Sequence, residues 1–309
     1  MSNRWWEIVI KCEPILEESV FWRVEEFGCS GTAIEMVLDE ELDLEFEFEE
    51  KPTSIRTYIP EIKARLSDLS TLSSYLNKDA KLLEASLPEV QWHLIDEEDW
   101  ASSWKQYWQP MSIGDRFLIY PAWESLPEET SKSIIRLDPG AAFGTGTHPT
   151  TQLCLESLEM RLYDNAKNQT IADLGCGSGI LSLGSILLGA KKVYAVDTDP
   201  LATESCFSNC QLNQIDRDKI AVFQGSIEKL VETNEIFDGI ICNILAETIT
   251  ELFPQFNQIT HEKSWAILSG ILLTQADSIA DIVEQQGWTV AALWKRKDWC
   301  CFNIRRSEY

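Results

Sequence analysis

The chain has 309 residues, 44% of them hydrophobic, and a formal net charge of −24 at pH 7. The length predicts two domains with complete apolar cores, and the charge argues against nonspecific binding to nucleic acid through a Lys and Arg footprint. The sequence has no apolar run of about 18 residues and no signal-peptide pattern, so we expect neither a membrane span nor a cleaved leader.

The first 96 residues predict the element order β-α-β-β-α-β, which is typical of a ferredoxin-like split unit. Alternating apolar residues predict strands at 6–10, 32–38, 55–59 and 90–95, and helical spacing predicts helices at 14–27 and 61–76. The second helix is expected to bury Ile62, Leu66 and Leu69. Because residues 1–96 contain no catalytic constellation, we interpret them as a substrate-recognition domain, with a stabilising cap on the rest of the chain as the alternative.

Two unusual segments lie within and after this pattern. Residues 40–50 alternate acidic and apolar side chains, which predicts a strand with one acidic face. A docking strip for lysines and a charged edge that blocks aggregation explain that face equally well. Residues 97–110 place Trp100, Trp104 and Trp108 on one stripe of a short helix, which is typical of packing against a domain. We interpret this helix as the interdomain linker.

From residue 111 to residue 309, strands and helices alternate as in a doubly wound parallel α/β sheet. Strands are expected at 117–120, 133–137, 171–174, 192–196, 220–224, 237–245, 265–269, 288–294 and 299–305. Helices are expected from about Thr150 and at 178–188, 200–213, 247–256 and 275–285. The last two strands form an antiparallel closing hairpin. Because the carboxyl ends of parallel strands share one edge, a ligand is expected there.

The turn at the centre of this sheet indicates which ligand binds. A dinucleotide fold uses G-x-G-x-x-G, whereas residues 173–179 read D-x-G-x-G-x-G. Asp173 would repel a pyrophosphate and attract a cationic amino group. Asp197 ends the next strand about 20 residues after Gly175, where a ribose-binding acid is found in such units. A ribose together with an ammonium group describes S-adenosylmethionine, and a structural turn without a ligand is the alternative.

Two further segments carry candidate contacts. Residues 137–159 form a loop rich in Gly, Pro and Thr that runs into a helix near Thr150, where free N–H groups suit a carboxylate or ribose oxygens. Phe143 in that loop could cover an adenine or the sulfonium methyl group. Ser226 follows the third strand, where an adenine edge would be read. His148 alone is more typical of a loop hydrogen bond than of a catalytic base.

The nine cysteines are scattered without a C-x-x-C pair, and the three histidines stand apart. This pattern predicts reduced thiols in a cytoplasmic protein, with neither a metal site nor a disulfide framework. The acidity favours a basic partner, although a solvated acidic surface explains the charge at least as well.

The motifs together resemble the PrmA-type methyltransferase family that acts on ribosomal protein L-eleven of the large subunit. The matching segments are LDPG with AFGTGTHPTT at 137–151, DLGCGSG at 173–179, NILA at 243–246 and LSGIL at 268–272. DLGCGSG by itself indicates only a class I methyltransferase, whereas the long loop together with NILA is far more specific. Ala141 and Glu247 depart from the family pattern, and Glu247 leaves the choice of acceptor slightly open.

The resemblance implies a class I S-adenosylmethionine-dependent methyltransferase with a seven-stranded, Rossmann-like sheet over residues 111–309. Its cofactor contacts fall on Thr151, Gly175, Asp197 and Asn243. The residues themselves add Asp173, Gly177, Phe143 and Ser226 to this set. The implied substrate is a basic ribosomal protein of the large subunit, methylated on lysine ε-amino or N-terminal α-amino groups.

The motifs contain neither a His/Asp pair nor paired carboxylates that would announce a general base. We therefore expect the enzyme to work mainly by alignment and desolvation, with Asn243 orienting the amine and solvent accepting the proton. Two alternatives remain: a methyltransferase of this fold that acts on RNA or a small molecule, and a nonenzymatic ribosome-associated binding protein. The acidity argues against RNA, and the intact cofactor motifs argue against the binding protein. The sequence does not predict an oligomeric state.

Overall fold

The computed structural model describes residues 4–27, 29–35, 53–96, 108–127, 129–138, 146–163 and 166–307. The chain divides into two compact units, Met1–Trp108 and Gln109–Tyr309. Within the described ranges, none of the helices has the length and apolar character needed to cross a membrane.

The amino-terminal unit is a four-stranded antiparallel sheet with two helices. Its elements are β1 (Arg4–Cys12), the 3-10 turn η1 (Pro14–Leu16), α1 (Glu17–Glu26), β2 (Ser30–Glu35), β3 (Thr53–Pro60), α2 (Leu66–Leu82) and β4 (Glu89–Asp96). The strand order β2-β3-β1-β4 is the order of a ferredoxin-like split unit, as the sequence predicts. Residues 40–50, Trp100 and Trp104 lie outside the described residues, while Trp108 is buried.

The second helix begins later than its apolar spacing predicts. Residues 61–63 form a turn after β3, and the Asp68 carboxylate accepts a hydrogen bond from the Arg65 N–H at 2.8 Å, which fixes the start of α2. The expectation that Ile62 and Leu66 point inward is therefore wrong, because their exposed fractions are 95% and 58%. Leu69 is buried as expected.

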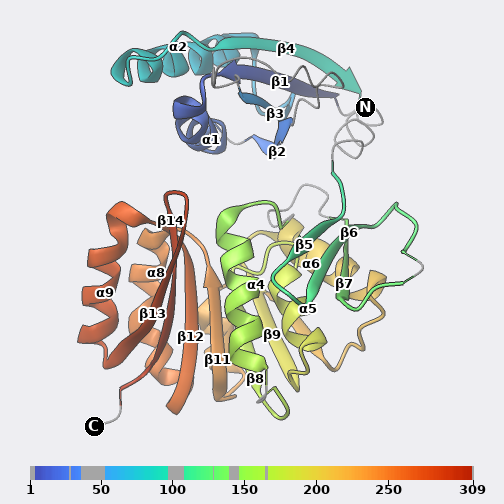
Figure 1. Cartoon of the computed structure of the whole chain (residues 1–309), viewed down its shortest axis with the longest axis vertical. Helices are drawn as coiled ribbons and strands as arrows, with labels where there is room; N and C mark the ends of the chain where they lie inside the picture. The colour runs from blue at the N-terminus through green and yellow to red at the C-terminus, as the bar shows by residue number, and fades with distance from the viewer. Residues whose placement is uncertain are drawn as a thin grey trace, which may run out of the picture. The chain divides into compact units, whose positions relative to one another are not determined.

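The carboxy-terminal unit is built on a seven-stranded sheet (Figure 1). Its strands are β8 (Thr170–Leu174), β9 (Lys192–Asp197), β10 (Ile220–Gln224), β11 (Phe237–Asn243), β12 (Thr260–Leu272), β13 (Trp288–Arg296) and β14 (Trp299–Arg306). They lie in the order β10-β9-β8-β11-β12-β14-β13, and β14 runs antiparallel to both of its neighbours. This is the expected doubly wound sheet with its antiparallel closing hairpin.

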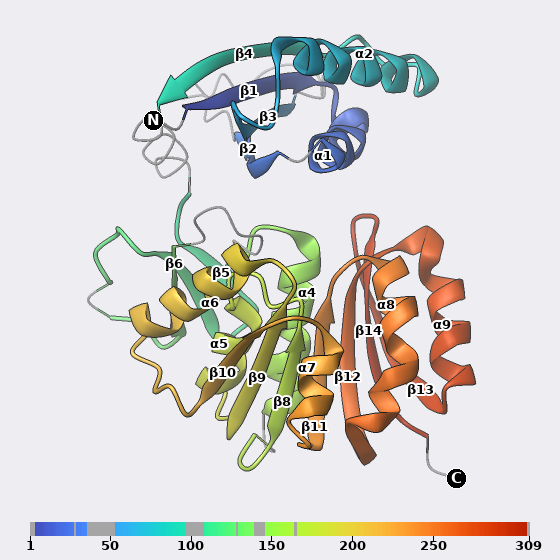
Figure 2. The same cartoon turned by 180° about the vertical axis from the view of Figure 1, so that it is seen from behind.

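Helices cover both faces of that sheet. The helices are α4 (Pro149–Leu162), α5 (Ile180–Leu187), α6 (Pro200–Leu212), α7 (Ile227–Glu232), α8 (Ala246–Leu252) and α9 (Ala276–Gln285), with 3-10 turns η3 (Phe253–Gln258) and η4 (Leu273–Gln275). In Figure 1, α4 lies in front of the sheet, whereas Figure 2 shows α7 and α8 in front of the opposite face. A separate three-stranded sheet contains β5 (Met111–Ile113), β6 (Phe117–Pro121) and β7 (Ser133–Leu137).

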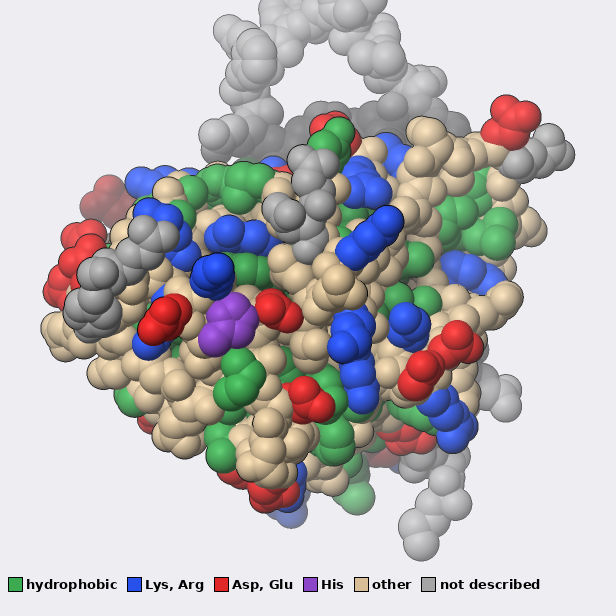
Figure 3. Space-filling view, turned by 90° about the horizontal axis from the view of Figure 1, so that it is seen from below, with side chains coloured by type: hydrophobic (Ala, Val, Ile, Leu, Met, Phe, Trp, Pro, Cys, Tyr) green, Lys and Arg blue, Asp and Glu red, His purple; other side chains and the backbone are tan. Residues whose placement is uncertain are grey.

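Figure 3 looks onto the face at the amino ends of the parallel strands, where Lys, Arg, Asp and Glu side chains are interspersed. Mixed charges of this kind are typical of a solvated surface. On this face, the structure favours the solvated interpretation of the protein's charge.

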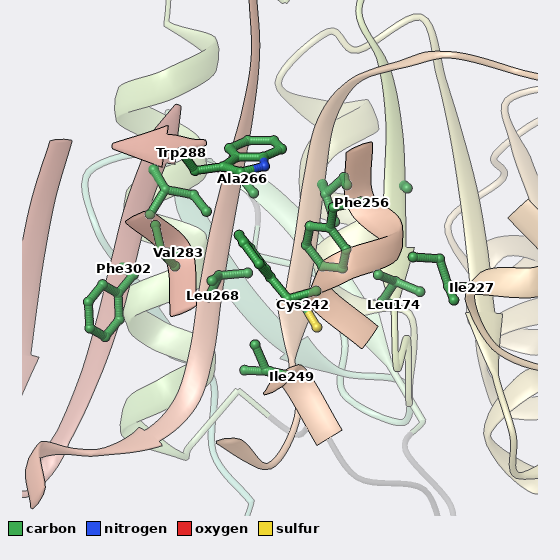
Figure 4. Packing of buried hydrophobic residues seen from close by; sticks show 14 of the residues in the cluster. Leu174, Ile227, Cys242, Ile249, Phe256, Ala266, Leu268, Val283, Trp288 and Phe302 are labelled. Carbon is green, nitrogen blue, oxygen red and sulfur yellow. The ribbon is translucent and has the colours of Figure 1, made fainter. Parts of the chain in front are cut away.

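The core between the sheet and the helices α7, α8 and α9 explains why the parallel strands read as continuous apolar runs. Strands covered on both faces bury consecutive residues, and Ile240, Ile241 and Cys242 in β11 are all fully buried. Figure 4 shows part of this cluster, including Leu268 and Trp288. The rigid core holds the carboxyl ends of the strands in fixed positions.

Those carboxyl ends form one row. Leu174 at the end of β8 pairs with Val196 in β9 and with Cys242 in β11. Asp197 pairs with Gln224 at the end of β10, and Asn243 pairs with Ser269 in β12. We call this row the carboxyl edge of the sheet, and the opposite row the amino edge.

Candidate functional site

The glycine turn at the end of β8 depends on backbone conformations that favour glycine. Gly175, Gly177 and Gly179 have φ angles of +73°, +51° and +80°, all in the left-handed region. A Cβ atom on Gly175 would lie 2.2 Å from Cγ2 of Ile244, which follows β11. The turn is also tied to β9, because the Gly175 N–H donates to the Val196 carbonyl at 2.9 Å. Glycine therefore allows the turn to lie against the end of the neighbouring strand β11.

Asp197 lies beside this turn at the end of β9. Its Oδ2 accepts a hydrogen bond from the Gly177 N–H at 2.9 Å, and its Oδ1 accepts one from the Asp199 N–H at 3.0 Å. Each oxygen of an ionised carboxylate can accept about two hydrogen bonds. The carboxylate is thus oriented by backbone donors and retains acceptor capacity for a ligand.

Asp173 lies beneath the turn and is fully buried. Its Oδ2 accepts a hydrogen bond from Ser182 Oγ at 2.6 Å, while Oδ1 has no donor among the described residues. Burial raises the pKa of Asp173 to about 7; the Ser182 bond opposes the rise and the charge of Asp197 adds to it. An acceptor without a donor, next to a second acid, would attract a cationic group bound nearby, although the Asp173 side chain itself is fully buried.

Asn243 and Thr151 meet at the other side of the turn. The Asn243 Nδ2 group donates to Thr151 Oγ1 at 3.3 Å. Thr151 is in the first turn of α4 and is almost completely buried, whereas Asn243 at the end of β11 is half-buried. The pair brings an amide and a hydroxyl group to the carboxyl edge.

The segments 243–246 and 268–272 pack closely against each other next to Asn243. Gly270 has a φ angle of +83°, and a Cβ atom there would lie 2.2 Å from the Ile244 carbonyl oxygen. Ser269 donates through Oγ to the Thr150 carbonyl at 3.3 Å. The exposed Glu247, one turn further on, accepts a hydrogen bond from Gln275 Nε2 at 2.9 Å.

His148 caps the amino terminus of α4. Its Nδ1 accepts a hydrogen bond from the Thr150 N–H at 3.3 Å, and its ring lies edge-on to Trp299 at 4.9 Å. Burial, with a smaller contribution from the charge of Lys297, lowers the pKa of His148 to about 4. The ring is therefore neutral at physiological pH and serves as a structural hydrogen-bonding group.

Of the two remaining predicted contacts, the structure describes Ser226 but not Phe143. Ser226 precedes α7 and lies next to the end of β9, because Gln224 pairs with Asp197. Phe143 lies outside the described residues. The carboxyl edge thus brings together the predicted set that the structure describes, namely Thr151, Asp173, Gly175, Gly177, Asp197, Ser226 and Asn243. Sequence reasoning missed Ser182 and Ile244, whose positions depend on how α5 and the end of β11 pack.

Among the described residues, no group of three or more His, Cys, Asp or Glu side chains is arranged to hold a metal ion.

Comparisons with known proteins identify the family. Residues 4–307 match the family model described as ribosomal protein L11 methyltransferase (PrmA). The chain belongs to this family. A ribosomal protein L11 methyltransferase from a Cyanothece species is 48% identical over 309 residues, which cover 99% of this chain and 100% of that protein. The corresponding protein from Thermosynechococcus vestitus is 44% identical over 308 residues, covering 99% of this chain and 98% of its own.

A solved structure agrees with these relatives. The ribosomal protein L11 methylase from Lactobacillus delbrueckii subsp. bulgaricus is 33% identical, covers 65% of this chain and 100% of its own, and has a TM-score of 0.59. The resemblance seen in the motifs is confirmed over nearly the whole chain.

Proposed function

We propose that this protein transfers methyl groups from S-adenosylmethionine to amino groups of ribosomal protein L11, on lysine side chains, the amino terminus or both. The observation that carries this proposal is the convergence of Asp197, the glycine turn and Asn243 at one edge of a class I sheet, in a chain of the PrmA family. The cofactor supplies an electrophilic methyl group on a sulfonium centre.

The residues at the carboxyl edge fit this cofactor. The acceptor capacity that remains on Asp197 suits the hydroxyl groups of a ribose, and the turn at Gly175 lets backbone approach the methionine portion. The orphaned Oδ1 of Asp173 contributes negative potential beneath the turn, where a cationic amino group would bind. Thr151 and Phe143 complete the proposed cofactor contacts, and Ser226 is proposed to read the adenine edge.

The acceptor amine must lose its proton before it can attack. A lysine with a pKa of ~10.4 is only about 0.1% neutral near pH 7.4, a cost of roughly 4 kcal/mol, whereas an α-amino group near 7.8 is about a quarter neutral. Asp173 has a raised pKa but is buried beneath the turn, and the His261–Asp238 pair lies at the amino edge. We therefore propose that Asn243 orients the amine and that solvent accepts the proton.

The net charge supports the proposed substrate, and the cysteines support the proposed compartment. A net charge of −24 attracts a basic protein substrate and disfavours direct binding to nucleic acid. All nine cysteines are free thiols, which supports a reducing compartment, and we propose the cytoplasm.

The test is methyl transfer from labelled S-adenosylmethionine to purified L11, with ribosomal RNA as a parallel acceptor. The wild type should label L11 and leave the RNA unlabelled, and mass spectrometry should locate the methylated amines. Labelled RNA would support the RNA alternative, and no labelled product at all would support the nonenzymatic one.

The role of Asn243 is tested by Asn243→Ala. This variant should lower kcat by about 10- to 100-fold, because small losses of alignment are costly, while the Kd for S-adenosylhomocysteine changes much less. Asn257→Ala at the amino edge is the control and should leave kcat unchanged. Turnover near the wild-type value with unchanged cofactor affinity would show that Asn243 has no such role.

A further inference from the structure

Asn209 on α6 is fully buried and lies outside the sequence motifs at 137–151, 173–179, 243–246 and 268–272. Its side chain makes two hydrogen bonds to backbone groups of distant segments. Oδ1 accepts from the Asp138 N–H at 2.9 Å, and Nδ2 donates to the Ser178 carbonyl at 2.9 Å. Because one partner is a donor and the other an acceptor, the orientation of the amide is fixed by chemistry.

The two partners of Asn209 belong to the two segments that carry most of the proposed cofactor contacts. Asp138 directly follows β7 and opens the segment 138–151, which ends at Thr151. Ser178 lies within the glycine turn, between Gly177 and Gly179. A single buried amide therefore joins the start of one segment to the turn of the other. Both bonds are to backbone atoms, so they fix chain position directly.

The rest of α6 supports the same connection. The helix starts just after Asp197: the Asp199 N–H donates to Asp197 Oδ1, and the Asp199 carboxylate caps the helix by accepting from the Leu201 N–H at 2.8 Å. Cys206, one turn before Asn209, packs so closely under Gly179 that a Cβ atom there would lie 2.6 Å from its sulfur. The helix thus touches the proposed ribose acid at its start and the glycine turn along its length.

Asn213, one turn after Asn209, ties the same helix to β7. Its Oδ1 accepts from the Arg136 N–H at 2.9 Å, and its Nδ2 donates to the Arg136 carbonyl at 2.6 Å. These bonds anchor β7 but make no contact with the glycine turn. Asn209, by contrast, bonds both to the residue that follows β7 and to the turn.

We propose that Asn209 is a positioning residue for cofactor binding. It holds the Ser178 carbonyl of the glycine turn and the Asp138 N–H after β7 at a fixed separation, so that the turn is in position before the ligand arrives. This inference rests on the proposed function, since the ligand is S-adenosylmethionine. Because the site is already ordered, less free energy is lost to ordering it when the ligand binds.

The test uses Asn209→Asp in the full chain. A carboxylate has nearly the same shape and can still accept from the Asp138 N–H, but it cannot donate to the Ser178 carbonyl. We expect the Kd for S-adenosylhomocysteine, measured by calorimetry, to rise about tenfold, because a buried carbonyl is left without its donor. KM for S-adenosylmethionine should rise in parallel, while KM for L11 stays within about twofold. A purely structural role would not produce this split.

Asn257→Asp is the matched control. Asn257 in η3 also accepts from an N–H group, Trp288 Nε1 at 2.9 Å, and donates to a backbone carbonyl, that of Gln286 at 3.1 Å. It differs from Asn209 in that it also accepts from Arg306, is exposed, and lies at the amino edge. This variant makes the same chemical change and should leave the cofactor Kd unchanged. If Asn209→Asp does not fold, Asn209→Ser is measured against the same criteria.

The outcomes separate this inference from the function on which it rests. A wild-type protein that neither binds S-adenosylhomocysteine nor methylates L11 overturns the proposed function. A functional wild type together with a folded Asn209 variant that binds the cofactor within twofold of it overturns only the role of Asn209. A tenfold loss of affinity with an unchanged KM for L11 supports that role.

Discussion

The two edges of the seven-stranded sheet differ in how the carboxylates beside them are paired. At the amino edge, Asp238 uses both oxygens: Oδ2 accepts from the Thr170 N–H at 2.8 Å and Oδ1 pairs with His261 Nε2 at 3.1 Å. Nearby, Trp265 Nε1 donates to Gln169 Oε1 at 2.9 Å. These pairs join the starts of neighbouring strands and leave little for a ligand to satisfy.

At the carboxyl edge, the same sheet carries left-handed glycines, an orphaned carboxylate oxygen on Asp173 and spare acceptor capacity on Asp197. Buried polar groups without partners destabilise a fold unless a ligand or proton satisfies them. The difference supports the proposal that the carboxyl edge binds the ligand, whereas the pairs at the amino edge stabilise the fold. Paired substitutions at the two edges can break or sharpen this distinction.

The largest difference is expected between Asp197→Ala and Asp238→Ala. Asp197→Ala should weaken the binding of S-adenosylhomocysteine by about 10²- to 10⁴-fold, because in the proposed role of Asp197 two charge-assisted hydrogen bonds to a ribose would contribute roughly 3–6 kcal/mol. Asp238→Ala removes the partner of the Thr170 N–H and should lower Tm while leaving the Kd unchanged. Calorimetry and thermal unfolding measure the two effects. Similar losses of affinity in both variants would mean that the edges do not differ in this way.

The pH dependence of the free energy of unfolding tests the raised pKa of Asp173 at the carboxyl edge. Burial raises the pKa of Asp173 to about 7, whereas the unfolded chain ionises this group near ~3.9. Between about pH 4 and 7 the folded state binds the extra proton, so stability falls as pH rises, by at most on the order of 4 kcal/mol. Asp173→Asn removes this titration. Its free energy of unfolding relative to the wild type, measured in urea, should therefore increase from pH 5 to pH 8.

Ser182 provides the control for that titration. Its hydroxyl donates to the ionised form of Asp173, which lowers the pKa of the carboxyl group. Ser182→Ala should therefore extend the fall in stability to higher pH. A difference between Asp173→Asn and the wild type that does not change with pH would contradict the assignment.

The sequence predicts the longer strands of the carboxy-terminal unit well because their signals are local and strong. The strands at 133–137 and 220–224 coincide with β7 and β10, since buried apolar runs bounded by turn residues leave little choice of register. The shared edge of Asp197 and Asn243 also follows from topology alone. The short elements β5 and α7 were not predicted, because three and six residues carry too little periodicity.

The features that the sequence does not predict are side-chain contacts and burial that arise only when the helices pack on the sheet. Asp173 is next to a glycine turn, but only the rotation of α5 brings Ser182 to its carboxylate and buries both. Ile62 and Leu66 have helical spacing with Leu69, yet the cap formed by Asp68 starts the helix after them. Asn209 bonds to residues 31 and 71 positions away, a separation that no local pattern reports.

A smaller difference is expected between alanine substitutions at Gly175 and Gly189, which both have positive φ angles. Gly175→Ala should destabilise the fold by roughly 1–3 kcal/mol and also displace Ile244, which would raise the cofactor Kd and lower kcat. Gly189→Ala carries similar backbone strain, but its Cβ atom would meet only Ala166 at 3.3 Å. That variant should lower Tm alone. Equal effects of both on binding would show that strain, and not the approach of Ile244, governs the site.

The smallest effect is expected at Glu247, an exposed acid on the carboxyl edge near Asn243. Its only described partner is Gln275, and exposed interactions of this kind contribute about 0–1 kcal/mol. Glu247→Gln preserves that bond but removes a charge that attracts a lysine ammonium group. KM for L11 should therefore rise about two- to fivefold, and more at low than at high ionic strength, because salt screens exposed charges. The cofactor Kd should not change. Salt-independent kinetics identical to those of the wild type would mean that acceptor attraction resides elsewhere on the protein.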